Sequence, residues 1–253
     1  MRYLSTGVLL GFLLLSCGES VIHPEPDRGY EYFPLKVGAS WTYQVDSIIF
    51  DDGGSINVLD TVSGFVNERI TGRTTDLTGD TVYTLERRHR ELITDPWTTT
   101  HIWTISRDDY RAVRNEENVR LVKMSFPLDT GSRWDPLRFV SPDTEVPVGT
   151  ELIEMYTNWS GAVLAIGHPK TVGDLMFGDV MTCQQADDDN EIERRYVREQ
   201  YARGIGLITR NDTILDSYCK RIGQIEPCFG LSWMEKGEKG YILQQQLIDF
   251  QQP

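Results

Sequence analysis

Positive charge is scarce in this sequence. Its 253 residues include 25 Lys and Arg against 38 Asp and Glu, a formal net charge of −13, and the basic residues form no long run. A protein that binds nucleic acid needs a basic patch to neutralise phosphates, and docking on anionic lipid by charge needs the same. The composition therefore excludes nucleic acid as a partner and excludes electrostatic docking on an anionic membrane.

Long apolar runs are also missing. The longest covers residues 7–15, far below the ~20 residues that a membrane-spanning helix needs. It follows a positively charged N-terminus, as in a secretory signal peptide. The run ends in Leu14-Leu15-Ser16-Cys17, which resembles the bacterial lipobox. We expect residues 1–16 to be a signal peptide and Cys17 to carry the lipid, although an ordinary signal peptide containing a cysteine is the alternative.

The segment after the cysteine predicts how the chain is anchored. Two or three acyl chains on Cys17 would hold a protein stably on a membrane. Gly18 stands where an inner-membrane retention signal would have Asp, which favours the outer membrane and leaves open whether the protein faces the periplasm or the surface. Residues 17–30 contain Pro24 and Pro26 and are typical of a solvated tether. The mature chain then carries a net charge of −14, and residues 31–253 are expected to form one antiparallel β domain.

Catalytic signatures are absent from the sequence. It has no nucleophile elbow, HExxH metal helix, phosphate-binding glycine loop or CxxC pair. Its four histidines, His23, His89, His101 and His168, are scattered. We therefore predict no cofactor and no confident metal site, assign no catalytic residue, and favour a non-enzymatic role.

Cysteine is rare, with four in the chain. Cys219 and Cys228 enclose eight residues, a loop that a disulfide closes easily in an oxidising compartment. We expect these two to pair around an irregular segment, residues 220–227. Cys183 is then left over and is expected to be a buried thiol in a strand.

What the sequence does contain is the pattern of many short strands. In residues 39–50 apolar and polar side chains alternate with a period of two, as in a half-buried strand. Asp and Gly then mark a turn at 51–54. Further strands are expected from about residue 56 and at 81–85, 97–106, 110–113, 119–126, 152–156, 163–166, 176–183, 205–210 and 241–250. Residues 190–202 fit either a helix or a strand, and we favour a strand. Hairpins in sequence order predict a mostly β fold, a single antiparallel meander forming a curved sheet, half-barrel or sandwich.

One motif occurs twice. Phe33-Pro34-Leu35-x-x-Gly38-x-x-Trp41 returns with identical spacing as Phe126-Pro127-Leu128-x-x-Gly131-x-x-Trp134. Proline extends the residue before it, glycine permits a sharp corner, and the tryptophan can then enter a core. We interpret the repeat as a fold-making corner used twice; a duplicated binding corner is the alternative.

Two segments resemble a known group of proteins. Residues 32–43, YFPLKVGASWTY, and residues 201–208, YARGIGLI, are similar to the PLxxGxxWxY and YAxGIGLI signatures of uncharacterised Bacteroidetes outer-membrane lipoproteins. The resemblance covers about thirty residues and brings no catalytic motif. It implies antiparallel sheets, in some members similar to the curved half-barrels of periplasmic lipid and lipoprotein carriers.

An acidic run suggests a weak cation site. Residues 187–191 hold four carboxylates, and hard cations such as calcium favour oxygen ligands. Asp187, Asp189 and Glu191 are the candidate ligands. The run lacks the glycine and the ligand spacing of a calcium loop, so a solvated hairpin tip is the alternative.

Four tripeptides resemble the O-glycosylation acceptor of Bacteroidetes, in which Asp precedes Ser or Thr and an aliphatic residue follows. Their acceptors would be Ser47, Thr61, Thr81 and Thr213. Asp-Thr-Val is also a common way for a strand to begin, so both interpretations stay open.

The sequence favours a non-enzymatic lipoprotein, anchored in the cell outer membrane, that binds an envelope protein, glycan or lipid. The competing hypothesis is a glycan hydrolase. Glycoside hydrolysis needs only two carboxyl groups at a set separation, and Glu86, Glu91, Glu151 and Glu154 are candidates. Two close carboxylates in a cleft would favour the hydrolase, and an apolar concave sheet would favour a lipid carrier.

Overall fold

The computed structural model describes residues 26–52, 57–141 and 143–253. The expected signal peptide, Cys17, His23 and part of the first predicted turn lie outside the described residues. Within them, twelve strands hydrogen-bond into one antiparallel sheet, in the order β6-β5-β4-β3-β2-β1-β14-β13-β12-β11-β10-β7. The predicted mostly β, antiparallel fold is confirmed.

The strands of this sheet are β1 (Ser40–Asp52), β2 (Asn57–Thr75), β3 (Thr81–Arg90), β4 (Thr98–Arg107), β5 (Arg111–Glu116), β6 (Val119–Ser125), β7 (Arg133–Trp134), β10 (Trp159–Val172), β11 (Leu175–Asp189), β12 (Glu193–Ala202), β13 (Gly206–Ser217) and β14 (Gly237–Gln251). A separate hairpin pairs β8 (Val146–Val148) with β9 (Glu151–Ile153). The helices are short: η1 (Tyr30–Tyr32), α1 (Tyr218–Ile222), η2 (Glu226–Cys228) and α2 (Trp233–Lys236).

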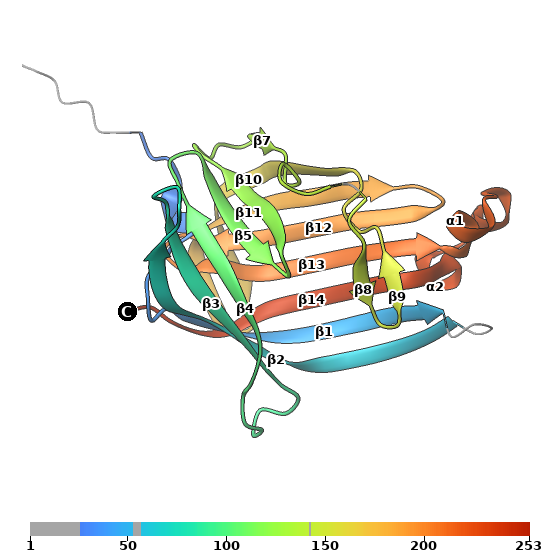
Figure 1. Ribbon diagram of the computed structural model, residues 1–253, viewed down its shortest axis with the longest axis horizontal. Coiled ribbons are helices and arrows are strands. Elements are labelled where there is room, and N and C mark those ends of the chain that lie inside the picture. The colour runs from blue at the N-terminus through green and yellow to red at the C-terminus, as the bar shows by residue number, and fades with distance from the viewer. Residues whose placement is uncertain (1–25, 53–56, 142) are drawn as a thin grey trace, which may run out of the picture.

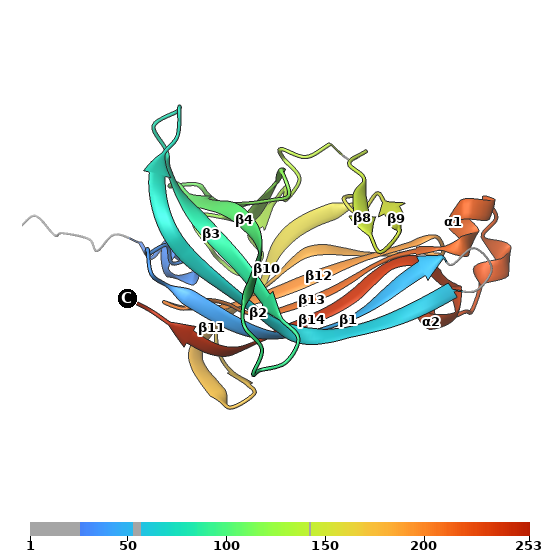
Figure 2. The same ribbon diagram turned by 60° about the horizontal axis from the view of Figure 1, so that its bottom comes forward.

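The sheet is strongly curved, as Figures 1 and 2 show. Strands β3 to β6 fold over strands β10 to β14, so the sheet curves into a nearly closed barrel, called the half-barrel below, with a concave inner face. The two edges meet at a seam between β6 and the residues around β7. There the Val122 amide donates to the Pro136 carbonyl at 3.0 Å, and Trp134 Nε1 donates to the Val122 carbonyl at 3.0 Å. These bonds satisfy backbone groups that an open edge would expose.

The repeated motif forms two similar corners. Gly38 and Gly131 have φ angles of 97° and 88°, a region that favours glycine. Each glycine amide donates to a strand carbonyl at 2.8 Å. Trp41 and Trp134 follow as the second residue of their strands, β1 and β7. The motif thus makes the same glycine corner at the start of β1 and of β7, as the fold-making interpretation predicts.

Sequence patterns located most strands but not their lengths. Residues 193–202 form a strand, as favoured over a helix. The strand predicted at 152–156 is wrong in extent, because only residues 151–153 are extended and they belong to the separate hairpin. The segment 218–236, predicted as irregular in part, holds the two short α-helices. No helix in the described part of the chain is long and apolar enough to cross a membrane.

Candidate binding groove

The concave face of the half-barrel carries a buried network of paired charges. Alternation along the strands turns these side chains inward. Four are cations and four are carboxylates: Arg87, Arg114, Lys123, Arg210, Glu68, Glu116, Glu199 and Asp212. These charges lie among apolar side chains, because Glu68, Arg114, Lys123 and Glu199 line one pocket together with Trp41, Tyr43, Leu85 and Ile105. The face is therefore mixed, and differs from the purely apolar concave sheet that would favour a lipid carrier.

One half of the network centres on Arg114 of β5. Its Nη2 lies 2.6 Å from Glu68 Oε1, and its Nε lies 2.6 Å from Glu116 Oε1. Arg87 adds a second ion pair to Glu68 at 2.5 Å. Both guanidinium groups also stack on Trp103, with 4.7 Å and 4.9 Å to the ring centroid. Because both charges of each pair are shielded from water, breaking one pair would leave a costly unpaired charge.

The other half centres on Arg210 of β13. Its Nε donates to both oxygens of Asp212, at 3.1 Å and 2.9 Å. Lys123 Nζ lies 2.5 Å from Glu199 Oε1. The other Glu199 oxygen accepts from the Tyr201 hydroxyl at 2.8 Å. Every carboxylate of the face is thus held by a cation or a hydroxyl.

Two carboxylates of the network have pKa values shifted in opposite directions. Burial disfavours the charged form of Glu116, but the guanidinium groups of Arg114 and Arg210 outweigh it and lower its pKa to about 2. For Asp212 burial dominates, so its pKa is raised although Arg210 partly offsets the effect. Glu116 is therefore a fixed negative charge at neutral pH.

A groove of about 270 Å³ lies beside this network. Its lining is rich in aromatic and apolar side chains with a few charged groups: Trp103, Glu116, Glu117, Val119, Leu121, Thr144, Glu145, Val146, Pro147, Met155, Tyr156, Trp159, Arg210 and Tyr241. Strands β4 to β6 supply one wall, and β13 and β14 supply the floor. A mostly apolar pocket with a few convergent polar groups is the usual form of a binding site.

The roof of the groove is a flap, residues 143–158, which includes the β8–β9 hairpin. Figures 1 and 2 show this hairpin lying across the concave side of the sheet. The carboxylate of Asp51 holds the tip, because it accepts from the Thr150 amide at 3.0 Å and from the Thr150 hydroxyl at 2.6 Å. Lys239 Nζ adds a bond to the Leu152 carbonyl at 2.8 Å. The flap is clasped to the ends of β1 and β14.

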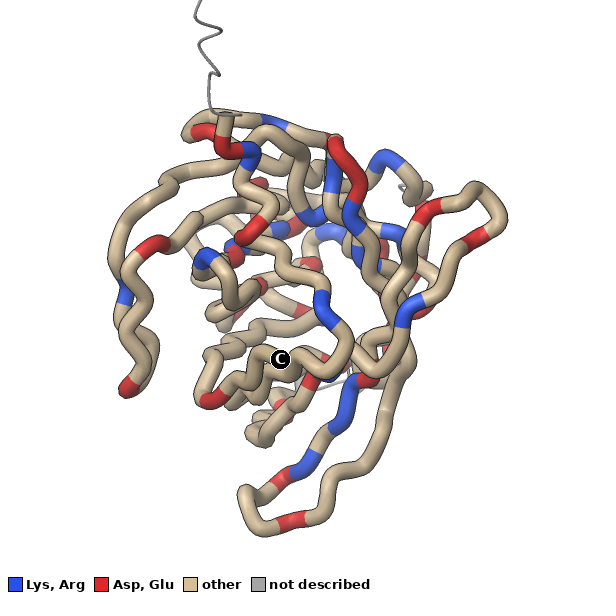
Figure 3. Tube along the Cα trace, turned by 90° about the vertical axis from the view of Figure 1, so that its left-hand side faces the viewer, with Lys and Arg blue, Asp and Glu red and all other residues tan. Residues whose placement is uncertain are grey.

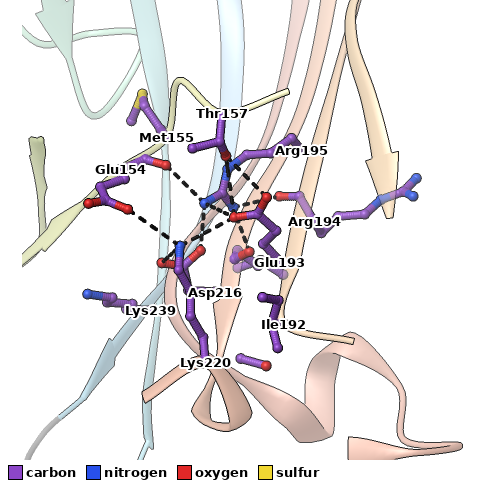
Figure 4. A network of polar contacts seen from close by, with 12 residues as sticks. Glu154, Met155, Thr157, Ile192, Glu193, Arg194, Arg195, Asp216, Lys220 and Lys239 are labelled. Atoms are coloured by element: carbon purple, nitrogen blue, oxygen red, sulfur yellow. Dashed lines mark hydrogen bonds and ion pairs between the residues drawn. The ribbon is translucent and has the colours of Figure 1, made fainter. Parts of the chain in front are cut away.

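The root of the flap is held by a fully buried arginine, shown in Figure 4. Arg195 Nη2 donates to the Glu154 carbonyl at 3.0 Å, and Nε donates to the Thr157 hydroxyl at 3.1 Å. The same guanidinium group pairs with Asp216 at 2.6 Å and with Glu193 at 3.2 Å. Charge-assisted bonds of this kind are stronger than neutral ones and fix geometry. Arg195 therefore positions the irregular segment between β9 and β10 that lines the groove at Tyr156.

A disulfide lies next to this root. Cys219 and Cys228 are joined with an S–S distance of 2.07 Å, and Cys183 is a buried free thiol. Helix α1 starts beside the bridge, and its Lys220 Nζ lies 3.0 Å from Asp216 and 3.3 Å from Glu193. The bridged loop thus contributes a cation to the network around Arg195.

The carboxylates suggested for a hydrolase do not line the groove. Glu86 accepts a bond from the Thr99 hydroxyl at 3.0 Å, and Glu91 is exposed after β3. Glu151 and Glu154 line a different cavity, of about 290 Å³. The groove carboxylates, Glu116, Glu117 and Glu145, were not singled out by the sequence, because their grouping depends on contacts between distant strands and the flap.

The acidic run binds cations of the chain itself. Asp189 pairs with Arg194 at 2.6 Å, Glu191 pairs with Lys236 at 2.8 Å, and Asp187 lies 4.0 Å from Arg198. Among the residues that the structure describes, no group of three or more His, Cys, Asp or Glu could hold a metal ion. The three candidate ligands thus lie in three separate ion pairs, and the calcium site stays a prediction from the sequence.

The candidate glycosylation acceptors lie on the sheet and are not among the residues that line the groove. The four candidate acceptors for glycosylation lie in strands: Ser47 in β1, Thr61 in β2, Thr81 in β3 and Thr213 in β13. Thr61 and Thr81 are exposed. His101 stacks on Trp103 at 5.4 Å and lies 3.1 Å from Glu117, so it adjoins the mouth of the groove.

Looking into the half-barrel along its long axis, Figure 3 shows acidic and basic residues intermixed over the strands and loops.

Comparisons with known proteins leave the function open. No family model matches the chain, and no curated protein matches it. Two solved structures are similar to it, each with a TM-score of 0.41 and each covering 87% of this chain and 98% of its own. One is described as a "putative lipoprotein" of Parabacteroides distasonis, at 7% identity. The other is described as a "putative exported protein with YmcC-like fold" of Bacteroides fragilis, at 10% identity. Neither similarity assigns a ligand or an activity.

Proposed function

We propose that this chain is a lipid-anchored, non-enzymatic binding protein of the cell envelope, held in the outer membrane through Cys17. The groove under the flap is its binding site. One observation carries this function: an aromatic groove of about 270 Å³ is roofed by a flap that is held at its tip and at its root. A preorganised pocket of this kind binds a ligand without first ordering its own walls.

The anchor rests on the lipobox at residues 14–17. The described chain enters at one end of the half-barrel, and helix α1 lies at the other end (Figure 1). A tether joined to the lipid at Cys17 would therefore leave the flap and the groove open to the compartment around the protein.

The competing function is hydrolysis of an envelope glycan. Glu116 and Asp212 favour it, because both contact Arg210 and their pKa values are shifted apart, which is a known pattern of acid and base pairs. Both Asp212 oxygens are occupied by Arg210, however, and the Asp212 side chain is fully buried. Such a carboxyl group is poorly placed to protonate a substrate.

The test uses the protein in its native cell. The intact mass of the purified mature protein should show loss of residues 1–16 and addition of acyl chains, and Cys17→Ala should abolish both. A photo-crosslinking amino acid at Val146, inside the groove, should give a discrete adduct. The same amino acid at Leu152, on the same flap but lining the other cavity, should not.

Three results would overturn the proposal. An unacylated product would remove the anchor, and equal adducts at both positions would remove the groove. Release of reducing ends from envelope glycan, lost in Asp212→Asn but retained in Glu86→Gln, would make the protein a hydrolase.

A further inference from the structure

The charge of the groove indicates what kind of ligand it takes. Its lining contains three carboxylates, Glu116, Glu117 and Glu145, and one cation, Arg210. Arg210 is already neutralised, since its guanidinium group contacts Asp212 at 2.8 Å and lies 3.9 Å from Glu116. Glu116 is likewise already paired, with Arg114 at 2.6 Å, so the charge that the buried network does not balance is that of Glu117 and Glu145. This excess negative charge favours a cation.

The carboxylates lie at different depths in the groove. Glu116 lies in the β5 wall, where its side chain is 15% exposed and Arg114 holds it in place. Glu117 is at the mouth, with a side chain that is 62% exposed and that lies 3.1 Å from His101. Glu145 is an exposed residue of the flap that lines both this groove and the neighbouring cavity of about 290 Å³. A cation that reaches the groove therefore meets the carboxylates of Glu117 and Glu145 first, while Glu116 is already paired with Arg114.

The aromatic walls suit the same ligand. Faces of Trp and Tyr rings attract ammonium and guanidinium groups, and more strongly where water is excluded. The molecule already uses this contact in one wall, because Arg87 and Arg114 stack on Trp103. Tyr156, Trp159 and Tyr241 line the groove itself. The walls therefore accept both the charge and the apolar stem of a basic side chain.

The size of the groove limits the ligand further. A site of about 270 Å³ lies just below the ~300–1,000 Å³ of sites that enclose drug-sized molecules. It has room for one long side chain. The acidic mature chain, with a net charge of −14, would also attract a basic partner from a distance.

We infer that the groove under the flap binds a lysine or arginine side chain of a basic segment in a partner protein. Glu117 and Glu145 pair with the cation at the mouth, and the rings of Tyr156 and Trp159 contain its stem. The inference rests on the proposed binding function and names its ligand.

The test measures binding of a synthetic peptide to the full mature protein in detergent. The probe is acetyl-(Gly-Lys)₃-amide, followed by tryptophan fluorescence, because Trp103 and Trp159 line the groove. We expect saturable binding that weakens as salt is added. The same peptide with each lysine acetylated should not bind, because acetylation removes the charge.

Variants identify the site. The double variant Glu117→Gln/Glu145→Gln should weaken binding about tenfold, and both side chains are exposed enough for the fold to tolerate the change. The matched control is Glu151→Gln, on the same flap but lining the other cavity, and it should bind like the unmodified protein.

Equal binding of the acetylated peptide, or equal affinity in the double variant, would overturn the inference. Binding of glucosamine without binding of the peptide would also overturn it, by showing that a free amino sugar is the ligand. The groove-specific adduct at Val146 would stand in each of these cases, so failure of the ligand class is distinguishable from failure of the proposed function.

Discussion

Glu116 is the residue at which the charge network meets the groove. Arg114 Nε lies 2.6 Å away and Arg210 Nη1 lies 3.9 Å away, and its pKa falls to about 2 on folding. A carboxyl group whose pKa is lowered by folding stabilises the native state most above the unfolded-state pKa, near 4.5. That stabilisation is lost as the pH falls through about 2.

The first prediction concerns Glu116→Gln. The amide cannot ionise, so the variant should be less stable than the unmodified protein at pH 7, by on the order of 3 kcal/mol. The difference should shrink as the pH falls from about 4.5 to about 2. Urea unfolding measured across this range checks it.

The control is Glu117→Gln, because the Glu117 side chain is 62% exposed, and exposed pairs contribute little. A Glu116→Gln deficit that stayed constant from pH 7 to pH 2 would contradict the assigned ionisation. The raised pKa of Asp212 has the opposite effect on how stability depends on pH. The variants must therefore be compared with each other at each pH, because the pH profile of one protein combines both effects.

Among the structural elements, the flap is the one that a single substitution should loosen most easily while the rest of the protein stays folded. Its tip depends on two hydrogen bonds from Thr150 to the Asp51 carboxylate. Asp51→Ala should therefore speed amide hydrogen exchange in residues 146–153 by about tenfold, with little change in global stability. Hydrogen exchange followed by mass spectrometry checks this.

A matched control for the flap is Asp46→Ala. Asp46 is also in β1, but it accepts from the Ser63 hydroxyl at 2.6 Å and does not contact the flap. Faster exchange of residues 146–153 in both variants would show that β1, and not the clasp, controls the flap.

Individual strands and helices also show how much of the fold could be predicted from the sequence. In β1, alternation of apolar and polar residues is local information, so the strand was found. In β12 the buried face carries Glu193, Arg195 and Glu199 beside Val197 and Tyr201. Charges on a buried face mask the period of two, which is why this segment also fitted a helix. Ser232 and Glu235 form a capping box at the start of α2, which is a local sequence pattern that predicts a helix start.

At the scale of the whole molecule, the groove could not be predicted from the sequence. The groove joins Trp103 of β4, Arg210 of β13 and Tyr156 of the flap, which come together only when the sheet curves. Glu68 and Arg114 are 46 residues apart, and no local pattern pairs them. The acidic run at 187–191 was prominent in the sequence because its charges are adjacent, yet its carboxylates serve ordinary ion pairs.

Closure of the half-barrel depends on how tightly Trp134 fits its seam. A Cβ added at Gly161 would lie 2.2 Å from the indole ring, and the backbone of Gly161 is not in the left-handed region. Glycine is therefore required at position 161 by the close contact with Trp134 and not by the backbone conformation. The indole Nε1 also donates to the Val122 carbonyl and to Gln185 Oε1, at 3.0 Å and 3.2 Å.

Gly161→Ala should displace Trp134, lower the free energy of unfolding by about 2–3 kcal/mol and free the edge of β6. Unpaired strand edges associate with each other, so the variant should self-associate with rising concentration in light scattering while the unmodified protein does so less. Gly178→Ala on neighbouring β11 is the control, because a Cβ there has nothing within 4 Å. If the two variants matched in stability and in scattering, Trp134 would not be closing the seam, and the half-barrel would have to be held shut by the β6 backbone bonds alone.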